Sequence, residues 1–179
     1  MELELKPSRN DEKLIENILG FTGKILIGVP EDTNRYLQTS GNTKEQIESR
    51  MNSNINNAQL LAILENGSPI KNLPPRRVIE PVIRKHEEQI REVFNKVYQL
   101  LIEGRREEAD KELNALSLAV QAWCQAFFRE DNGWEPDKPA TIHAKNRRAG
   151  KPKDAPTTTL IDTGSLRGAI RGIYVKGRR

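Results

Sequence analysis

Few residues of this 179-residue chain are of the types that perform catalysis. It contains two histidines, His86 and His143, and one cysteine, Cys124. The histidines are far apart in the sequence, and Cys124 has no neighbouring residue that would activate its thiol as a nucleophile. His86 lies among charged residues, which is typical of a surface histidine. The sequence also lacks GxxxxGK(S/T), GxGxxG, HExxH and GxSxG, so it offers no phosphate-binding, dinucleotide-binding, zinc-protease or serine-hydrolase motif.

The acidic residues do not supply a catalytic pair either. Adjacent carboxylates occur at two places with a helical pattern, Glu87 with Glu88 and Glu107 with Glu108. Neighbouring residues of a helix point in different directions, so these pairs cannot share a proton for acid–base catalysis. One cysteine is too few for an intrachain disulfide or a cysteine-rich zinc site. We therefore predict a protein that is not an enzyme and that has no metal and no cofactor.

The charge of the chain is unevenly distributed. Residues 132–179 carry 11 Lys and Arg against 4 Asp and Glu, a balance of +7, whereas residues 1–131 carry 18 against 21, a balance of −3. Such a basic segment is either a solvated arm or a surface for DNA, RNA or an acidic protein. No aromatic residue lies within its densest run of cations, residues 145–153, so only general electrostatic contact with phosphates is supported there. The cations that we expect to contact DNA or an acidic partner are Arg147, Arg148, Lys151 and Lys153.

Two consecutive segments predict a helical hairpin. In residues 78–102 apolar side chains recur at intervals of three and four, which predicts an amphipathic helix of about seven turns. After Gly104, residues 106–128 repeat the pattern with Leu113, Leu116, Val120, Trp123 and Phe127. The short connection predicts that the two helices are antiparallel. We expect both aromatic residues of the second helix in the core rather than in a ligand site, and Cys124 as a small buried hydrophobe.

Shorter patterns predict the remaining elements, which are a helix over 11–19, a strand over 24–29, a long polar loop over 31–57, a helix over 58–67, a proline-rich loop over 68–81 and a terminal strand over 170–175. Together they predict an α+β fold, in which a small antiparallel sheet packs on helices, with an extended Pro-rich loop and a basic C-terminal arm. We divide the chain into a body (1–131), a basic extended arm (132–159) and a C-terminal segment (160–179). The turn and strand of this last segment complete the sheet of the body or pair with a neighbouring subunit.

The sequence shows no sign of membrane insertion or secretion. No apolar run approaches the roughly 20 residues of a membrane span. The N-terminal MELELKPSRN is polar and acidic, unlike a secretory signal. We expect an intracellular protein that does not bind a membrane.

Three segments, in this order, resemble one protein family. They are NNAQLLAILENGSPIKNLPPRRVIEPVI (56–83), NGWEPDKPATIHAK (132–145) and LIDTGSLRGAI (160–170). They resemble the head–tail joining, tail-completion and virion-morphogenesis proteins of tailed bacteriophages. In these proteins NAxxAxxxExG leads into IPxRPFLxPxI, a tryptophan precedes TIxxK, and LIDTGxLRxSI closes the chain. The matching positions are Asn57, Ala58, Glu65, Gly67, Pro74, Arg76, Pro81, Ile83, Trp134, Thr141, Ile142, Lys145, Asp162, Thr163, Gly164, Leu166, Arg167 and Ile170. The departures are Asn66 for an aromatic residue, Arg77 and Val78 for Pro-Phe, and Ala169 for serine.

The resemblance implies that the protein is a structural component of a virion. Proteins of this family are small α/β units whose copies form a ring at the base of the head or the top of the tail, around the DNA path. It implies that this chain forms a six- or twelve-fold ring in the virion neck, after a stage in the host cytoplasm, between connector-side and tail-side proteins. Any contact with DNA in the lumen would be non-specific. The interface candidates are Glu65, Gly67, Pro74, Pro75, Arg76, Trp134, Thr141, Ile142, Lys145, Asp162, Thr163, Gly164, Leu166 and Arg167.

Several alternatives stay open at this point. The chain could instead form a tail-terminator ring that caps the tail, or act as a nucleic-acid-binding accessory protein through its basic arm. Trp134 is either a plug in its own core or an anchor in a neighbouring subunit. Residues 65–76 either contact the next ring or only cross the subunit's own surface. Gly164 is expected to supply a turn conformation that a Cβ would penalise, and Arg167 to pair with a carboxylate within the fold or across an interface.

Overall fold

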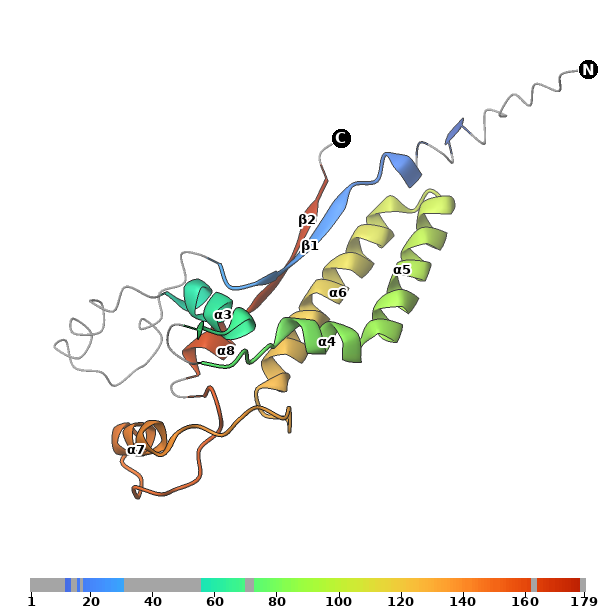
Figure 1. Ribbon diagram of the computed structural model, residues 1–179. Helices are drawn as coiled ribbons and strands as arrows, with labels where there is room; N and C mark the ends of the chain where they lie inside the picture. Colours follow the sequence, from blue (N-terminus) through green and yellow to red (C-terminus); the bar gives the residue numbers. More distant parts are fainter. Residues whose placement is uncertain are drawn as a thin grey trace, which may run out of the picture.

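The protein is an α+β unit in which a two-stranded antiparallel sheet packs against helices, as predicted (Figure 1). A computed structural model describes residues 12–13, 16, 18–30, 56–69, 73–161 and 164–177. In chain order its elements are β1 (Gly23–Gly28), α3 (Asn57–Asn66), α4 (Ile79–Lys85), α5 (Glu87–Ile102), α6 (Arg106–Phe127), α7 (Pro139–Arg148), α8 (Ser165–Ala169) and β2 (Arg171–Lys176). The two strands run along one side of α6, and α5 runs along its other side.

The helical hairpin is formed by α5 and α6. Gly104 lies between them with φ of 77°, a left-handed conformation that glycine adopts without steric cost. The apolar stripes meet in one cluster near the turn, made of Val97, Leu100, Leu101, Ala109 and Leu113. Farther along α6, Cys124 and Phe127 are buried as predicted, and Trp123 is half-buried against the same core. The hairpin is therefore the scaffold on which the other elements pack.

The single helix predicted over 78–102 is in fact two helices. The chain breaks at His86, which has φ −108° and ψ 20° and separates α4 from α5. No aliphatic residue lies between Ile83 and Ile90, so nothing in that turn holds one continuous apolar stripe against α6. His86 instead stacks on Trp123, with ring centroids 3.9 Å apart and planes 6° from parallel. The prediction of an ordinary surface histidine is therefore wrong, because the bend places this ring against α6.

The two strands of the sheet come from opposite ends of the described chain. β1 and β2 pair with Leu26 opposite Ile173 and Ile27 opposite Gly172, close to the predicted bounds of both strands. β2 passes tightly over α6, since a Cβ on Gly172 would lie 1.9 Å from the Ser117 carbonyl oxygen. The amide of Gly172 also donates to Gln121 Oε1 at 3.0 Å. The C-terminal strand thus completes the subunit's own sheet, one of the two predicted alternatives.

The segment predicted as a basic extended arm, 132–159, contains a helix, so the expectation of an extended arm is wrong for 139–148. α7 begins at Pro139, where the fixed φ of proline suits the first helical position. On this helix, the side-chain amide of Asn146 donates to the carbonyls of Lys153 and Ala155 at 3.0 and 2.8 Å, so the following loop folds back on the helix. Charge alone indicated a solvated segment, whereas these hydrogen bonds fold it back on itself.

The described N-terminal residues are 12–13, 16 and 18–30. The described residues among 11–19 are helical, in agreement with the predicted helix. The predicted polar loop 31–57 lies outside the described residues except at its end, where Asn56 caps α3 and Asn57 begins it. None of the helices in the described part of the chain is long and apolar enough to cross a membrane.

Candidate functional site

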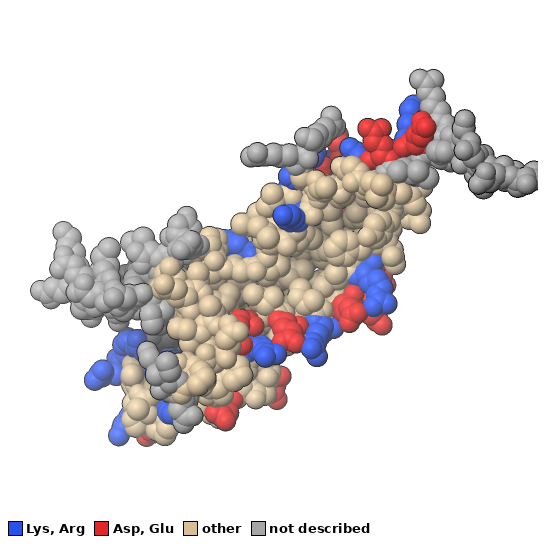
Figure 2. All heavy atoms as spheres, turned by 45° about the horizontal axis from the view of Figure 1, so that its top comes forward, with Lys and Arg blue, Asp and Glu red and all other residues tan. Residues whose placement is uncertain are grey.

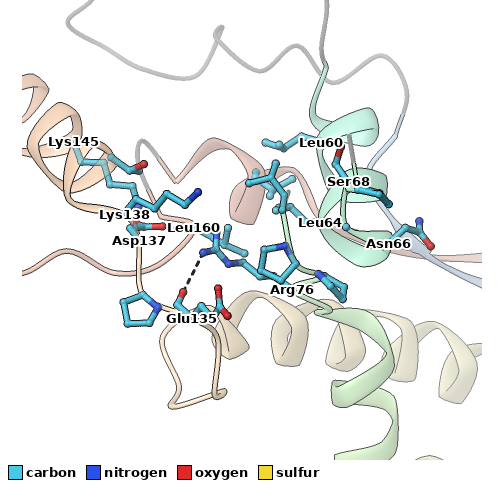
Figure 3. Close-up of a pocket in the computed structure, with 18 of the residues that line it drawn as sticks. Leu60, Leu64, Asn66, Ser68, Arg76, Glu135, Asp137, Lys138, Lys145 and Leu160 are labelled. Carbon is cyan, nitrogen blue, oxygen red and sulfur yellow. Dashed lines mark hydrogen bonds and ion pairs between the residues drawn. The ribbon is translucent and has the colours of Figure 1, made fainter. Parts of the chain in front are cut away.

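The three segments that carry the family resemblance come together around one cavity. The cavity has a volume of about 690 Å³ and opens between α3, the loop after it, the chain before α7, and α8. Figure 3 shows Lys138, Asp137 and Lys145 on one side and Leu60 and Leu64 of α3 on the other. The interface candidates that line it are Gly67, Pro74, Pro75, Arg76, Thr141, Lys145 and Leu166. Residues far apart in the sequence thus form one continuous surface.

The loop after α3 is held in place by Glu65. One oxygen of this carboxylate accepts the backbone N–H groups of Val78 and Ile79 at 2.8 and 2.9 Å. These groups belong to the start of α4, where helical N–H groups lack partners within the helix and negative charge is favourable. Gly67 has φ of 74°, and a Cβ there would lie 2.9 Å from the Leu73 carbonyl oxygen. The loop is thus folded tightly, and it presents the exposed Pro74 and Pro75 at the edge of the cavity.

Three charged side chains form a nearly buried network beside the cavity. Lys145 Nζ lies 2.5 Å from Asp137 Oδ2 and donates to the Thr158 carbonyl at 2.9 Å. Arg76 lies 3.9 Å from the other oxygen of Asp137 and donates to the Glu135 carbonyl at 3.1 Å. The side chains of Asp137, Lys145 and Arg76 are only 6%, 9% and 16% exposed. One carboxylate therefore joins the Pro-rich loop to α7 through two cations.

Trp134 packs within its own subunit. Its ring makes edge-to-face contacts with Phe127 and Phe128, with centroids 5.6 and 5.8 Å apart. Such contacts add to the stabilisation from burial of apolar area. Of the two roles left open for this residue, the structure supports the plug in its own core. It fixes the segment that leads from α6 to the charged network.

The last segment forms the floor of the cavity. Gly164 has φ of 76° and precedes α8, as expected of a turn residue that needs a left-handed conformation. Leu166 is buried and lines the cavity, and the Oγ of Ser165 accepts a hydrogen bond from Asn57 Nδ2 at 3.1 Å. Asp162 and Thr163 lie outside the described residues. Arg167 is half-buried, and no carboxylate among the described residues pairs with it.

The remaining cations gather at the end of α7. Arg147, Arg148, Lys151 and Lys153 are exposed on the last turn and the following loop, and Figure 2 shows basic side chains gathered at that end of the molecule. Arg148 also lines the cavity, and Ile142 is half-buried on the same helix. The cavity wall thus carries the cations Arg76, Lys138, Lys145 and Arg148 against the carboxylates Glu135 and Asp137.

Some functional residues escaped the sequence predictions. Asp137 was not singled out, although it is the centre of the charged network, and neither were Lys138, Leu60, Leu64 and Leu160. The only local signal was the position of Asp137 between two prolines just before α7. Leu60 and Leu64 were visible only as part of a helical apolar pattern, which does not distinguish a cavity wall from a core.

The cysteine and the histidines, which could act as a nucleophile, a base or metal ligands, do not line the cavity. Burial raises the pKa of the Cys124 thiol to about 12, so the thiolate is scarce near neutral pH. His143 lies 3.1 Å from Asp154 in an exposed position on α7. Within the ranges described, no group of three His, Cys, Asp or Glu side chains is placed to hold a metal ion. The cavity has leucines on one side and the cations Lys138 and Lys145 on the other.

Comparison with known proteins gives no relative from which a function could be transferred. No protein-family model, curated protein or solved structure matches the chain. Its function is therefore inferred from its residues and geometry.

Proposed function

We propose that the protein is a structural virion subunit that forms a ring at the head–tail interface of a tailed phage. In this role it joins the connector to the tail around the DNA path, as a neck or tail-completion protein, after a stage in the host cytoplasm. The observation that carries the proposal is the convergence of the three segments resembling that family. They lie on α3 and its loop, on α7 and the residues before it, and on α8 and the residues before it, and all three line one cavity. The charged network of Arg76, Asp137 and Lys145 joins the first two segments.

The cavity suits a peptide segment of another virion protein better than a small substrate. Leu60, Leu64 and Leu166 offer an apolar wall, and the cations of the opposite wall outnumber its carboxylates by two. The Asp137 carboxylate is already engaged by Lys145 and Arg76, whereas Arg76 donates to the backbone carbonyl of Glu135 and not to its carboxylate. An extended acidic segment with an apolar side chain would satisfy both walls. Such a contact would order on assembly and would add to the ring's hold on its connector-side or tail-side neighbour.

Electron microscopy of a phage whose copy of this gene carries an early nonsense codon tests the proposal. We expect DNA-filled heads beside complete but unattached tails. Tails of abnormal length, or tails that fall apart, would replace the neck assignment by the tail-terminator ring. Normal infectious particles would overturn both ring assignments. Supplying the wild-type protein from a plasmid should restore attachment, which controls for effects of the codon on neighbouring genes.

A second function, nucleic-acid binding, is favoured by one observation. Arg147 on the last turn of α7, and Lys151 and Lys153 on the following loop, are exposed. If they neutralise phosphates, replacing them together with Arg148 by alanine should flatten the dependence of DNA affinity on salt, by roughly 0.9 in the logarithmic slope for each phosphate that is no longer neutralised. An unchanged slope in the quadruple variant would remove this function.

A further inference from the structure

Two apolar patches on the surface have no partner in the described chain. The sheet patch consists of Leu26, Ile173 and Val175, and the α5 patch consists of Phe94, Tyr98 and Ile102. All six side chains are between 39% and 55% exposed. Isolated exposed apolar residues are common, whereas contiguous apolar patches mark interaction sites.

The sheet patch is the outer face of β1 and β2. Side chains alternate along a strand, and Ile25, Ile27 and Tyr174 face the helices. The alternate positions therefore point away from α6, and Leu26 lies directly opposite Ile173 in the register. Val175 lies two residues farther along β2, so the three side chains form a patch about 7 Å long and 5 Å wide. Figure 2 shows a wide area with few charged side chains on the face turned to the viewer.

The α5 patch is a stripe on one side of a helix. Phe94, Tyr98 and Ile102 are spaced by four residues, which places them one above the other over about 12 Å. The adjoining flank of α5 supplies Val97, Leu100 and Leu101 to the hairpin core. The stripe is therefore additional to the apolar residues that the fold itself uses. It is long enough to cover the sheet patch.

The charges around the two patches are of opposite sign. The outer face of the sheet also carries Lys24 and Arg171, and by alternation no carboxylate. α5 carries Glu87, Glu88 and Glu92 against two cations, and both cations are already paired, Arg91 with Glu87 and Lys96 with Glu112, each at 2.7 Å. Glu88 and Glu92 form no ion pair with the described residues, so this helix keeps an acidic excess. Two sheet patches facing each other would bring cations together, whereas a sheet patch facing an α5 patch brings opposite charges together.

We propose that the sheet patch of one copy packs on the α5 patch of the next copy. This contact rests on the proposed ring function and specifies its subunit interface. It is heterologous, because each copy contributes a different surface on each side, and such a contact closes into a ring when the rotation between copies permits. The occupant of both patches is thus a second copy of this chain.

Cysteine cross-linking tests which surfaces meet. Leu26→Cys and Tyr98→Cys are prepared as separate proteins, mixed at high concentration and treated with a short bismaleimide, which tolerates small errors of register. The native Cys124 is buried and provides no competing thiol, so the wild type is the blank. We expect a mixed dimer from the two variants and little product from either variant alone. The doubly substituted protein should give a ladder of dimers, trimers and higher species.

The same double variant, supplied to the nonsense phage, separates the two proposals. If the variant is present in purified particles and cross-links there into the ladder, the result supports both the neck assignment and the proposed interface. Protein in the particles without a ladder there, and without a mixed dimer in solution, overturns this interface but not the neck assignment. If the only cross-linked product is a dimer of the Leu26→Cys variant with itself, the proposed interface is wrong and two sheet patches meet instead. Absence of the protein from the particles overturns the neck assignment, and the mixed dimer in solution then still decides the interface.

A charge substitution gives an independent readout. Ile173→Glu places a carboxylate in the middle of the sheet patch and should reduce the mixed cross-linked product at least tenfold. Leu118→Glu is the matched control, because Leu118 on α6 is similarly exposed, at 53% against 46% for Ile173, and belongs to neither patch. Equal losses in both variants, or no loss in either, would overturn the proposal.

Discussion

Removal of the Asp137 carboxylate should destabilise the protein more than removal of any of the ion pairs that lie exposed on the surface elsewhere in the protein. Asp137→Ala leaves two cations, Lys145 at 9% and Arg76 at 16% side-chain exposure, without their shared counter-charge. Removing one partner of a buried ion pair costs about 3–5 kcal/mol. For a domain of this length each kcal/mol shifts Tm by roughly 2–4 °C, so Tm should fall by about 6–20 °C.

The complementary change at Lys145 should cost less. Lys145→Met keeps the apolar stem and leaves Asp137 with Arg76, at 3.9 Å, while the hydrogen bond to the Thr158 carbonyl disappears. We expect a loss of about 1–3 kcal/mol. The double variant should lose less than the sum of the two single losses, by about 1–3 kcal/mol, because the side chains interact directly.

Thermal and urea unfolding followed by circular dichroism measure these differences. Arg105→Ala is the control, since it removes the exposed pair with Glu108 at 2.5 Å, which solvent screens, and should leave the unfolding midpoint nearly unchanged. A loss for Asp137→Ala no larger than that of the control would refute the assignment of a buried network. Additivity in the double variant would refute the direct coupling.

Three further predictions concern single contacts. Glu65→Ala should cost about 1–3 kcal/mol because it strips two N–H groups at the start of α4 of their acceptor, whereas Glu65→Gln keeps the accepting oxygen and should lose less than half as much in urea titrations. Gly172→Ala should cost about 2–4 kcal/mol, since its Cβ would lie 1.9 Å from the backbone of α6. Gly28→Ala, which meets nothing within 4 Å, should stay within about 1 kcal/mol of the wild type in the same unfolding assay. With its pKa raised to about 12, Cys124 should not react with a disulfide reagent at pH 8 until guanidinium unfolds the chain, and rapid labelling of the native protein would contradict its burial.

The elements with a strong periodic pattern were predictable, and the bend between α4 and α5 was not. Apolar spacing predicted α5, α6 and both strands, because one face of each is set against the core. At His86 the pattern only thinned out, and nothing local distinguished a straight helix from a bent one. The bend depends on Trp123, which lies on another helix and offers its ring for stacking.

The candidate site was predictable only as separate pieces. The family-like segments indicated Arg76 and Lys145, yet the residue that joins them, Asp137, has no local pattern of its own. Its role depends on two cations brought together by folding, one from the loop after α3 and one from α7. A sequence displays each side chain beside its chain neighbours, whereas an ion-pair network is defined by neighbours in space.

The basic segment shows how folding changes the meaning of a charge count. From the sequence, Lys145 belongs to the same run of cations as Arg147, Arg148, Lys151 and Lys153. In the helix α7 it points inward to Asp137, and those that follow remain exposed. Because Asp137 belongs to the same segment, this pair leaves the balance of +7 unchanged, but it withdraws Lys145 from the cations that the segment offers to a partner. A DNA-affinity change on replacing Lys145 would consequently report loss of the fold around the cavity, whereas replacement of the exposed group reports phosphate contact alone.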